Sequence, residues 1–273
     1  ELGQVLVLLP TRRACRSLRE SFLRVREGVP LLLPKIRPIA DIDEEELALY
    51  WIRTQPGFAE RLIDIPPAIP TMRRQLLLSR LILEFQSHRQ GHDVKGMDPA
   101  QSLALAGELS SFLDRMQTER LAFSELKKIV PDQLAAHWQQ TLDFLRILTE
   151  HWPSTLASEG CIDPADRRNR LLDLLASAWQ RSPPEHPVIA AGSTGTIPAT
   201  ADLLKVVATL PKGCVVLPGL DQWLDEESWR NIDETHYQYG LRRLILHLGV
   251  PRFDIPNWME PETEGEGHHR PKF

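Results

Sequence analysis

The spacing of apolar positions changes twice along the chain, and the changes divide the sequence into three blocks. The first block opens with a continuous apolar run, Val5 to Leu9, of the kind found in parallel strands buried on both faces. Pro10 ends this run and Thr11 is a good N-cap, so a helix is expected next. The apolar face of this helix is spaced by three and four residues and consists of Cys15, Leu18, Phe22 and Val25.

Two further elements are predicted before the second block. A short strand is expected from about Lys35 to Ile39. A helix is expected from about Asp43, because the acidic start of that segment suits the positive end of a helix dipole. Proline-rich stretches at 65–70 and 182–187 then bracket a block of different character.

The middle block, from about Thr71 to Trp179, is predicted to be helical and holds no strand candidate. Asp precedes Pro at 98–99 and at 163–164, which predicts an N-cap followed by proline at the first helical position. The helices expected here are Arg73–Gln86, Asp98–Thr118, Asp132–Trp152 and one that begins at Asp163.

The third block returns to alternating strands and helices. Strands are predicted at Val188–Ala191 and Gly213–Leu217, with the helix Ala199–Thr209 between them. A strand, a helix and a second strand at this spacing form a crossover unit, which implies a parallel sheet. Neither the first nor the third block alone has enough strands to bury its helices, so the two are expected to share one sheet.

The fold class predicted from these patterns is α/β. One α/β domain with a parallel sheet is split in the sequence, and an all-helical domain is inserted between its halves. The predicted boundaries are 1–70 with 186–250 for the α/β domain, 71–185 for the helical insertion and 251–273 for a polar linker. Tandem domains in simple order are the alternative.

Composition narrows the class of protein. Hydrophobic residues make up 42% and charged residues 25% of the 273 positions, as in an ordinary soluble globular protein. No apolar run approaches the roughly 20 residues of a membrane helix, so no membrane contact is expected. Cys15, Cys161 and Cys214 are odd in number and far apart, which favours a reducing cytoplasm over a disulfide framework. The net charge of −5 restricts nucleic-acid binding to a local basic face.

A turn of small residues follows the strand Val188–Ala191 and precedes a helix expected from about Pro198. The residues of this turn are Gly192, Ser193, Thr194 and Gly195. A strand, a small-residue turn and a helix start are the usual architecture of a phosphate site in α/β proteins. No lysine follows the glycines and no acid ends the strand. A working nucleotide site, a degenerate one and a tight structural turn are therefore all open.

Four segments, in this order, resemble the AddB subunits of bacterial AddAB helicase–nucleases. They are VLVLLPTRRACRSLRESFL from Val5, IRPIADIDEEEL from Ile36, HWQQTLDFLRILTEHWP from His137 and VIAAGSTGTIPATADLL from Val188. The resemblance extends to THYQYGLRRL near Thr235, and it depends on the order of the segments because none is a specific motif alone. It implies a RecA-like, superfamily-1 helicase domain with a helical insertion, near the start of a longer subunit.

The resemblance supplies positions for a nucleotide site. Active helicases of this type have a Gly-Lys-Thr/Ser phosphate loop, a strand ending in Asp-Glu and a strand ending near Gly-Asp-x-x-Gln. The second position reads Ala190–Ser193 here and lacks a carboxylate, whereas the third keeps Asp221 and Gln222. A phosphate loop would lie upstream of Glu1. Without paired acids Mg²⁺ and the phosphates lose their clamp, so a degenerate site without ATP hydrolysis is predicted, with a structural turn as the alternative.

The resemblance also implies a contact with DNA. Arginines follow one side of the first predicted helix, at positions 12, 16, 19 and 26. Thr11, Arg12, Arg13 and Arg16 occupy the place where helicases of this family contact single-stranded DNA. A helix N-terminus with a threonine cap also suits a phosphate. A solvated arginine face that only forms ion pairs is the alternative.

Two functions follow from the resemblance. One is a noncatalytic DNA-binding and scaffolding region of a helicase–exonuclease subunit in double-strand break repair, with an AddA-type partner supplying the motor. The other is an active ATP-dependent helicase domain whose phosphate loop lies outside this sequence. No cofactor is expected in this fragment, because the resemblance assigns ATP, Mg²⁺ and an iron–sulfur cluster to other parts of the parent complex.

The remaining candidates are expected to be structural. The tryptophans of the amphipathic helices are predicted to pack in cores and not to stack on bases, and they are Trp138, Trp152 and Trp179. His137 and His151 lack the spacing of paired metal ligands on a helix. The acids at 41–46 are predicted to form a solvated face at a helix start.

Overall fold

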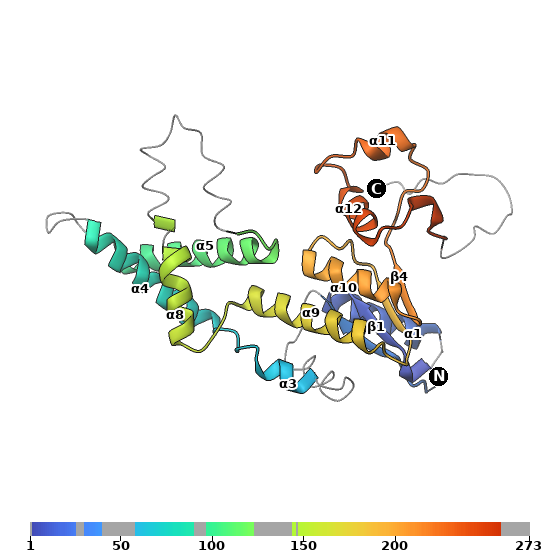
Figure 1. Ribbon diagram of the computed structural model, residues 1–273, viewed down its shortest axis with the longest axis horizontal. Helices are drawn as coiled ribbons and strands as arrows, with labels where there is room; N and C mark the ends of the chain where they lie inside the picture. Colours follow the sequence, from blue (N-terminus) through green and yellow to red (C-terminus); the bar gives the residue numbers. More distant parts are fainter. Residues whose placement is uncertain are drawn as a thin grey trace.

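The computed structural model describes residues 2–25, 30–39, 58–89, 97–122, 144–145 and 147–257, with a short 3-10 helix η1 (Leu2–Gln4) at the start (Figure 1). The strands of the described part are β1 (Leu6–Leu9), β2 (Lys35–Pro38), β3 (Val188–Ala191) and β4 (Gly213–Val216). All four run parallel in one sheet, in the order β2-β1-β3-β4. The α/β class is confirmed, as is the expectation that the first and third blocks share one parallel sheet.

Different helices cover the two faces of this sheet, because successive side chains of a strand point to opposite faces. Helix α1 (Arg12–Val25) packs over one face, where the buried residues are Val7, Leu9, Cys15 and Ile36. Helices α9 (Pro164–Arg181) and α10 (Pro198–Thr209) cover the other face. The strand residues buried there include Leu6, Leu8, Val188 and Ala190. The sheet is therefore the middle of three layers, as in open parallel α/β sheets.

The middle block forms a helical region with its own core. Its elements are α4 (Thr71–Arg89), α5 (Pro99–Thr118), the π-helical turn η3 (Ile147–His151) and α8 (Trp152–Ser158). Buried side chains from these elements, including Leu78, Ile82, Leu113 and Trp152, form this core. Among the described residues of this region the only β-type contact is one isolated bridge between Ala68 and Ile162. A short helix before it, α3 (Phe58–Ile63), instead places Leu62 against the core of the sheet.

The helix predicted from Asp98 to Thr118 is confirmed, and the Asp98 carboxylate accepts a hydrogen bond from the Ala100 amide at 3.4 Å. The starts expected at Asp43 and Asp132 lie outside the described residues. The chain stays helical past the expected end at Trp152, and Pro153 falls in the first turn of α8, a position that tolerates proline.

Helix α9 connects the helical region to the sheet (Figure 1). Its second half belongs to the core of the sheet, through Leu172, Leu175 and Trp179. The predicted boundary assigned all of α9 to the insertion at 71–185. Apolar spacing alone identifies the buried face of a helix but not the neighbour that it packs against.

Asp163, at the start of α9, joins helices of the middle region and is only 1% exposed. Its carboxylate lies 2.8 Å from the Arg74 guanidinium and accepts hydrogen bonds from the Gln117 amide at 2.7 Å and the Trp152 indole at 3.0 Å. The sequence predicted an N-cap here, and Asp163 occupies that position without a side-chain capping bond. The carboxylate is drawn away by the ion pair with the buried Arg74 and by hydrogen bonds from Trp152 and the partly buried Gln117, since a buried charge must be paired.

The chain after β4 folds into a C-terminal lobe. It contains α11 (Glu226–Arg230), α12 (Tyr239–Leu248) and the 3-10 helix η4 (Arg252–Asp254) around a small core of Trp229, Ile232 and Ile245. Residues 251–257, predicted as the start of a linker, are folded, because Arg252 is buried against the loop after β4. Residues 258–273 lie outside the described part. None of the helices in the described residues has the length and apolar character of a membrane span.

Candidate functional site

The sheet has a topological switch point between β1 and β3. The chain leaves β1 toward β2 on one side and leaves β3 toward β4 on the other, so the turns after β1 and β3 start side by side at the carboxyl edge. A Cβ built on Gly192 would lie 3.5 Å from Cδ of Pro10, which measures how close the two turns are. Ligands of open α/β sheets bind in this kind of crevice. The structure thus brings the two predicted sites, one starting at Thr11 and one at Gly192, to one place.

The turn after β1 presents a capped and arginine-rich helix start. The hydroxyl of Thr11 accepts a hydrogen bond from the Ala14 amide at 3.1 Å, which confirms Thr11 as the N-cap of α1. Arg12, Arg13 and Arg16 are exposed, and α1 carries five arginines against one glutamate. This helix is therefore a locally basic surface in a chain of negative net charge.

The arginine stripe is not uniform along α1. Arg19 donates a hydrogen bond to the carbonyl of Ile36 at 3.0 Å, so its guanidinium is tied to β2. Arg26 lies outside the described residues. Cys15 faces the sheet between the arginines, and burial raises the pKa of its thiol. A protonated, buried thiol is a packing residue, because the thiolate is the nucleophilic form.

The turn after β3 is closed from within. Gly192 and Gly195 have φ angles of +76° and +60°, in the left-handed region that favours glycine. The amide of Gly192 donates to the carbonyl of Val216 at 2.9 Å, and the amide of Gly195 donates to the hydroxyl of Ser193 at 3.2 Å. A phosphate-binding turn needs such amides pointing outward, and these two are already used.

Helix α12 lies against this turn. A Cβ on Gly195 would approach Cδ1 of the buried Leu244 to 2.6 Å, and a Cβ on Gly240 would lie 3.3 Å from Cγ2 of Thr196 and 3.6 Å from Cβ of Thr194. A nucleotide phosphate at this turn would have to displace α12. The start of α10 behind the turn has Ile197 at its N-cap position and no side-chain capping bond. The geometry is that of a packing turn.

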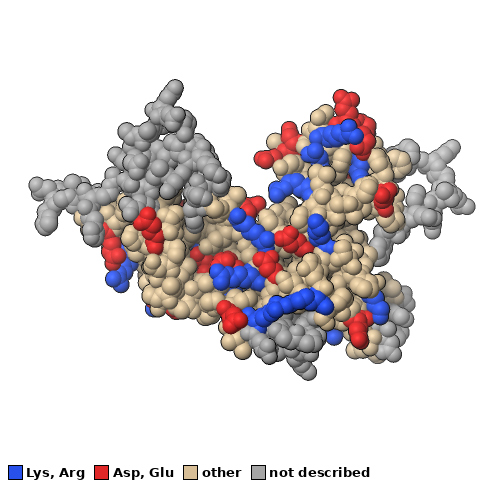
Figure 2. Space-filling model, in the orientation of Figure 1, with Lys and Arg blue, Asp and Glu red and all other residues tan. Residues whose placement is uncertain are grey.

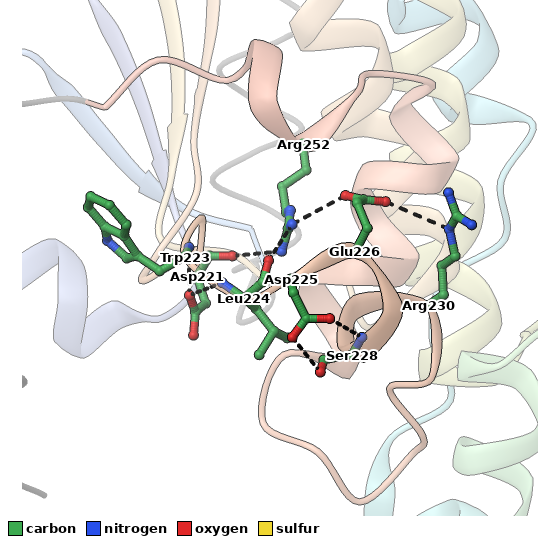
Figure 3. Close-up of polar contacts among 8 residues, drawn as sticks. All are labelled: Asp221, Trp223, Leu224, Asp225, Glu226, Ser228, Arg230 and Arg252. Atoms are coloured by element: carbon green, nitrogen blue, oxygen red, sulfur yellow. Dashed lines mark hydrogen bonds and ion pairs between the residues drawn. The ribbon is translucent and has the colours of Figure 1, made fainter.

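Asp221 and Gln222, the other predicted nucleotide-site positions, stabilise the loop after β4. Figure 3 shows the contacts of Asp221 with Trp223 and Leu224. One carboxylate oxygen of Asp221 accepts hydrogen bonds from the amides of Trp223 at 2.9 Å and Leu224 at 3.0 Å. The other accepts from the Tyr237 hydroxyl at 2.9 Å. The side-chain amide of Gln222 donates to the carbonyl of Ile255. Both side chains are thus engaged within the C-terminal lobe.

Electrostatics agree with this structural role for Asp221. Burial raises the pKa of its carboxyl, but the hydrogen bonds from Tyr237, Trp223 and Leu224 and the nearby charge of Arg252 outweigh it, so the pKa lies below its ordinary value. The carboxylate is therefore ionised at neutral pH, and its oxygens are occupied by donors of the protein itself.

Sequence reasoning missed Gln238 and Arg252, which complete this loop. The side chain of Gln238 accepts from the Asp221 amide at 3.2 Å and donates to the carbonyl of Gly219 at 2.8 Å. The Arg252 guanidinium donates to the carbonyls of Asp221 at 3.2 Å and Leu224 at 2.6 Å. Single polar residues in a C-terminal segment carry no spacing signal, so only the tertiary structure assigns them.

The other sequence candidates are distributed as follows. Trp152 and Trp179 are fully buried core residues, as predicted. Trp138, His137 and the acids at 41–46 lie outside the described residues. Across the parts of the chain that are described, no three histidine, cysteine or acidic residues are grouped so that they could hold a metal ion.

No family model matches the chain, and the search of curated proteins found no match. The resemblance to AddB subunits therefore stays a prediction from the sequence.

Proposed function

We propose that this chain is the noncatalytic, helicase-like DNA-binding and scaffolding region of an AddB-type helicase–exonuclease subunit in double-strand break repair. In this proposal the parallel sheet is a RecA-like core, the helical region at 71–185 is an inserted domain, and an AddA-type partner provides the motor. The proposed compartment is the cytoplasm.

The observation that carries the proposal is the difference between the two turns at the switch point. Nucleotide chemistry is disfavoured after β3, where α12 packs on Gly195 and the turn lacks a lysine and paired acids. Binding of a phosphate backbone is favoured after β1, where the α1 N-terminus lies beside the exposed Arg12, Arg13 and Arg16. A scaffold that holds DNA without hydrolysing ATP uses only the surface after β1.

The DNA surface is tested by replacing two arginines. Arg12→Ala with Arg16→Ala is expected to lower affinity for a short single-stranded oligothymidylate about ten-fold at low salt, because each phosphate contact releases counterions. Fluorescence anisotropy measures the affinity, and an unchanged melting temperature shows that the fold is intact, since exposed charges contribute little to stability.

A matched control separates a local surface from net charge. Arg80→Ala with Arg170→Ala removes the same charge from exposed positions on α4 and α9 that form ion pairs within their own helices. This control variant is expected to bind DNA like the unmodified chain. Equal losses in both variants, or no loss in the Arg12/Arg16 variant, would contradict the proposed DNA surface.

The noncatalytic part of the proposal is tested with nucleotide. We expect no ATP hydrolysis and at best millimolar ATP affinity, because the turn has neither a lysine nor paired acids to neutralise a triphosphate. Micromolar Mg-ATP binding in calorimetry would favour the active-helicase alternative instead.

A further inference from the structure

Arg120 has an unusual backbone conformation for its residue type. Its φ is +54°, and no other non-glycine residue in the described part of the chain has a positive φ. The residue ends α5: its amide donates to the carbonyl of Gln117 at 3.0 Å, and the next amide, of Leu121, donates to that of Met116 at 2.9 Å. Glycine is the usual residue here, because a side chain strains the left-handed region. Such strain persists where the surrounding structure uses the side chain.

The guanidinium of Arg120 joins three helices. It donates to the Asp202 carboxylate on α10 at 2.8 Å and also pairs with Asp173 on α9. Helix α5 belongs to the core of the helical region, whereas α10 and the second half of α9 pack on the sheet. Figure 2 shows basic and acidic side chains intermixed where the helical region meets these helices. Arg120 therefore fastens the end of α5 to the helical layer that covers the sheet.

Asp202 has a second partner, which lies on the helix that covers the turn after β3. One oxygen of the Asp202 carboxylate accepts from Arg120, and the other lies 2.9 Å from Nε2 of His247 on α12. His247 follows Leu244 by three positions, so the two side chains are neighbours on the surface of α12. A Cβ on Gly195 would meet Leu244, as described above. Neighbouring side chains of α12 thus close the turn and contact Asp202.

We propose that Asp202 couples the helical region to α12, so that the Arg120 contact sets how firmly α12 covers the turn after β3. A carboxylate held at one oxygen presents the other in a fixed direction. Arg120 therefore removes rotamer freedom that the contact with His247 would otherwise have to remove.

The coupling acts in both directions, since a coupling free energy between two contacts is reciprocal. Displacing the end of α5 releases Asp202 and loosens α12. A partner that moves the helical region thereby changes access to the turn at the switch point. This device is built into the packing of the helices and does not depend on DNA binding by α1.

Hydrogen exchange of the whole chain, followed by mass spectrometry on peptides from α12, tests the coupling. Arg120→Gly removes the guanidinium but suits the left-handed end of α5, so that helix keeps its last turn. Exchange in α12 is expected to become about two- to five-fold faster, the effect of losing one partly exposed ion pair. Exchange in α1, on the opposite face of the sheet, should not change.

Two further variants locate the path of the coupling. Asp173→Asn removes the partner of Arg120 on α9 and leaves Asp202 in place, so α12 should exchange as in the unmodified chain. In a His247→Ala background Asp202 no longer contacts this histidine, so Arg120→Gly should not accelerate α12 further.

Four outcomes would overturn the inference. Unchanged exchange of α12 in Arg120→Gly would show that the two contacts are independent. Equal acceleration of α1 and α12 would show a general loss of stability. Acceleration of α12 by Asp173→Asn to the same extent, or an undiminished effect of Arg120→Gly in the His247→Ala background, would show that the effect does not pass through Asp202.

Discussion

The turns after β1 and β3 lie next to each other, lead into helices and differ in accessibility. The first keeps its helix start exposed, capped by Thr11 and followed by Arg12 and Arg13. The second has the more glycine-rich sequence and is covered by α12. Accessibility of a helix start is thus decided by what packs across it, and here the cover comes from Leu244, far along the chain. A glycine-rich turn can serve close packing as well as ligand binding.

The largest expected effect comes from adding one methyl group to the closed turn. Gly195→Ala places a Cβ at a φ of +60° and 2.6 Å from Leu244, so strain and overpacking add. We expect a loss of about 2–5 kcal/mol in the free energy of unfolding, measured by urea denaturation.

Gly219→Ala is the matched control for this substitution. Its φ is +59°, and nothing lies within 4 Å of the added Cβ. The loss should be limited to the backbone term, about 1–2 kcal/mol. Equal losses at the two positions would mean that α12 does not close the turn after β3.

A double-mutant cycle sharpens the same comparison. Leu244→Ala alone is expected to cost about 2–5 kcal/mol, because Leu244 is 1% exposed. In the double variant with Gly195→Ala, the space left by Leu244 admits the new methyl group. The two losses should therefore fall short of additivity by about 1–3 kcal/mol. Strict additivity in urea denaturation would place the strain elsewhere.

Much of this edge was predictable from local patterns. The apolar run at Val5–Leu9 predicted a buried strand, the crossover after Val188 predicted parallel strands, and Pro10 with Thr11 predicted the start of α1. The strand after the crossover, β4, is only partly buried. These signals depend on neighbours within a few residues. A sheet of parallel strands then follows from the general rules for crossover connections.

Local sequence patterns could not predict that α12 covers the turn after β3. Leu244 belongs to an ordinary amphipathic pattern, and only the tertiary structure places it over Gly195. Asp163 matched the N-cap pattern and yet pairs with Arg74, because a buried cation outweighs one capping bond. Asp221 matched a helicase-like pattern in the sequence, but in the structure it is the polar centre of a loop. In each case a residue distant in sequence decides the role.

Removing the N-cap of α1, in the turn after β1, should have a smaller effect on stability. Thr11→Ala removes the acceptor for the Ala14 amide, which should cost about 1 kcal/mol in the free energy of unfolding. Thr11→Ser keeps an oxygen at that position and should lie within a few tenths of a kcal/mol of the unmodified chain. Identical urea midpoints for the alanine and serine variants would show that this helix start is stabilised by other contacts.

The loop after β4 extends the comparison to a third turn at this edge, one that is stabilised by a charge. Because the folded-state pKa of Asp221 is lowered, its charge stabilises the fold above the unfolded-state pKa, and this contribution is lost as the pH falls through the folded-state pKa.

The Asp221→Asn variant tests this contribution. It keeps a side-chain oxygen that can accept hydrogen bonds from the amides of Trp223 and Leu224, but it removes the negative charge. The variant should be slightly less stable at neutral pH and lose less stability on acidification, measured by urea denaturation from neutral pH to about pH 3. Some acid dependence should remain, because hydrogen bonds also lower the pKa of Asp225 and Asp233. Tyr237→Phe removes one hydrogen-bond donor to Asp221 and should reduce the loss of stability on acidification by a smaller amount. If the unmodified chain, Asp221→Asn and Tyr237→Phe gave parallel profiles of stability against pH, this carboxylate would not stabilise the loop.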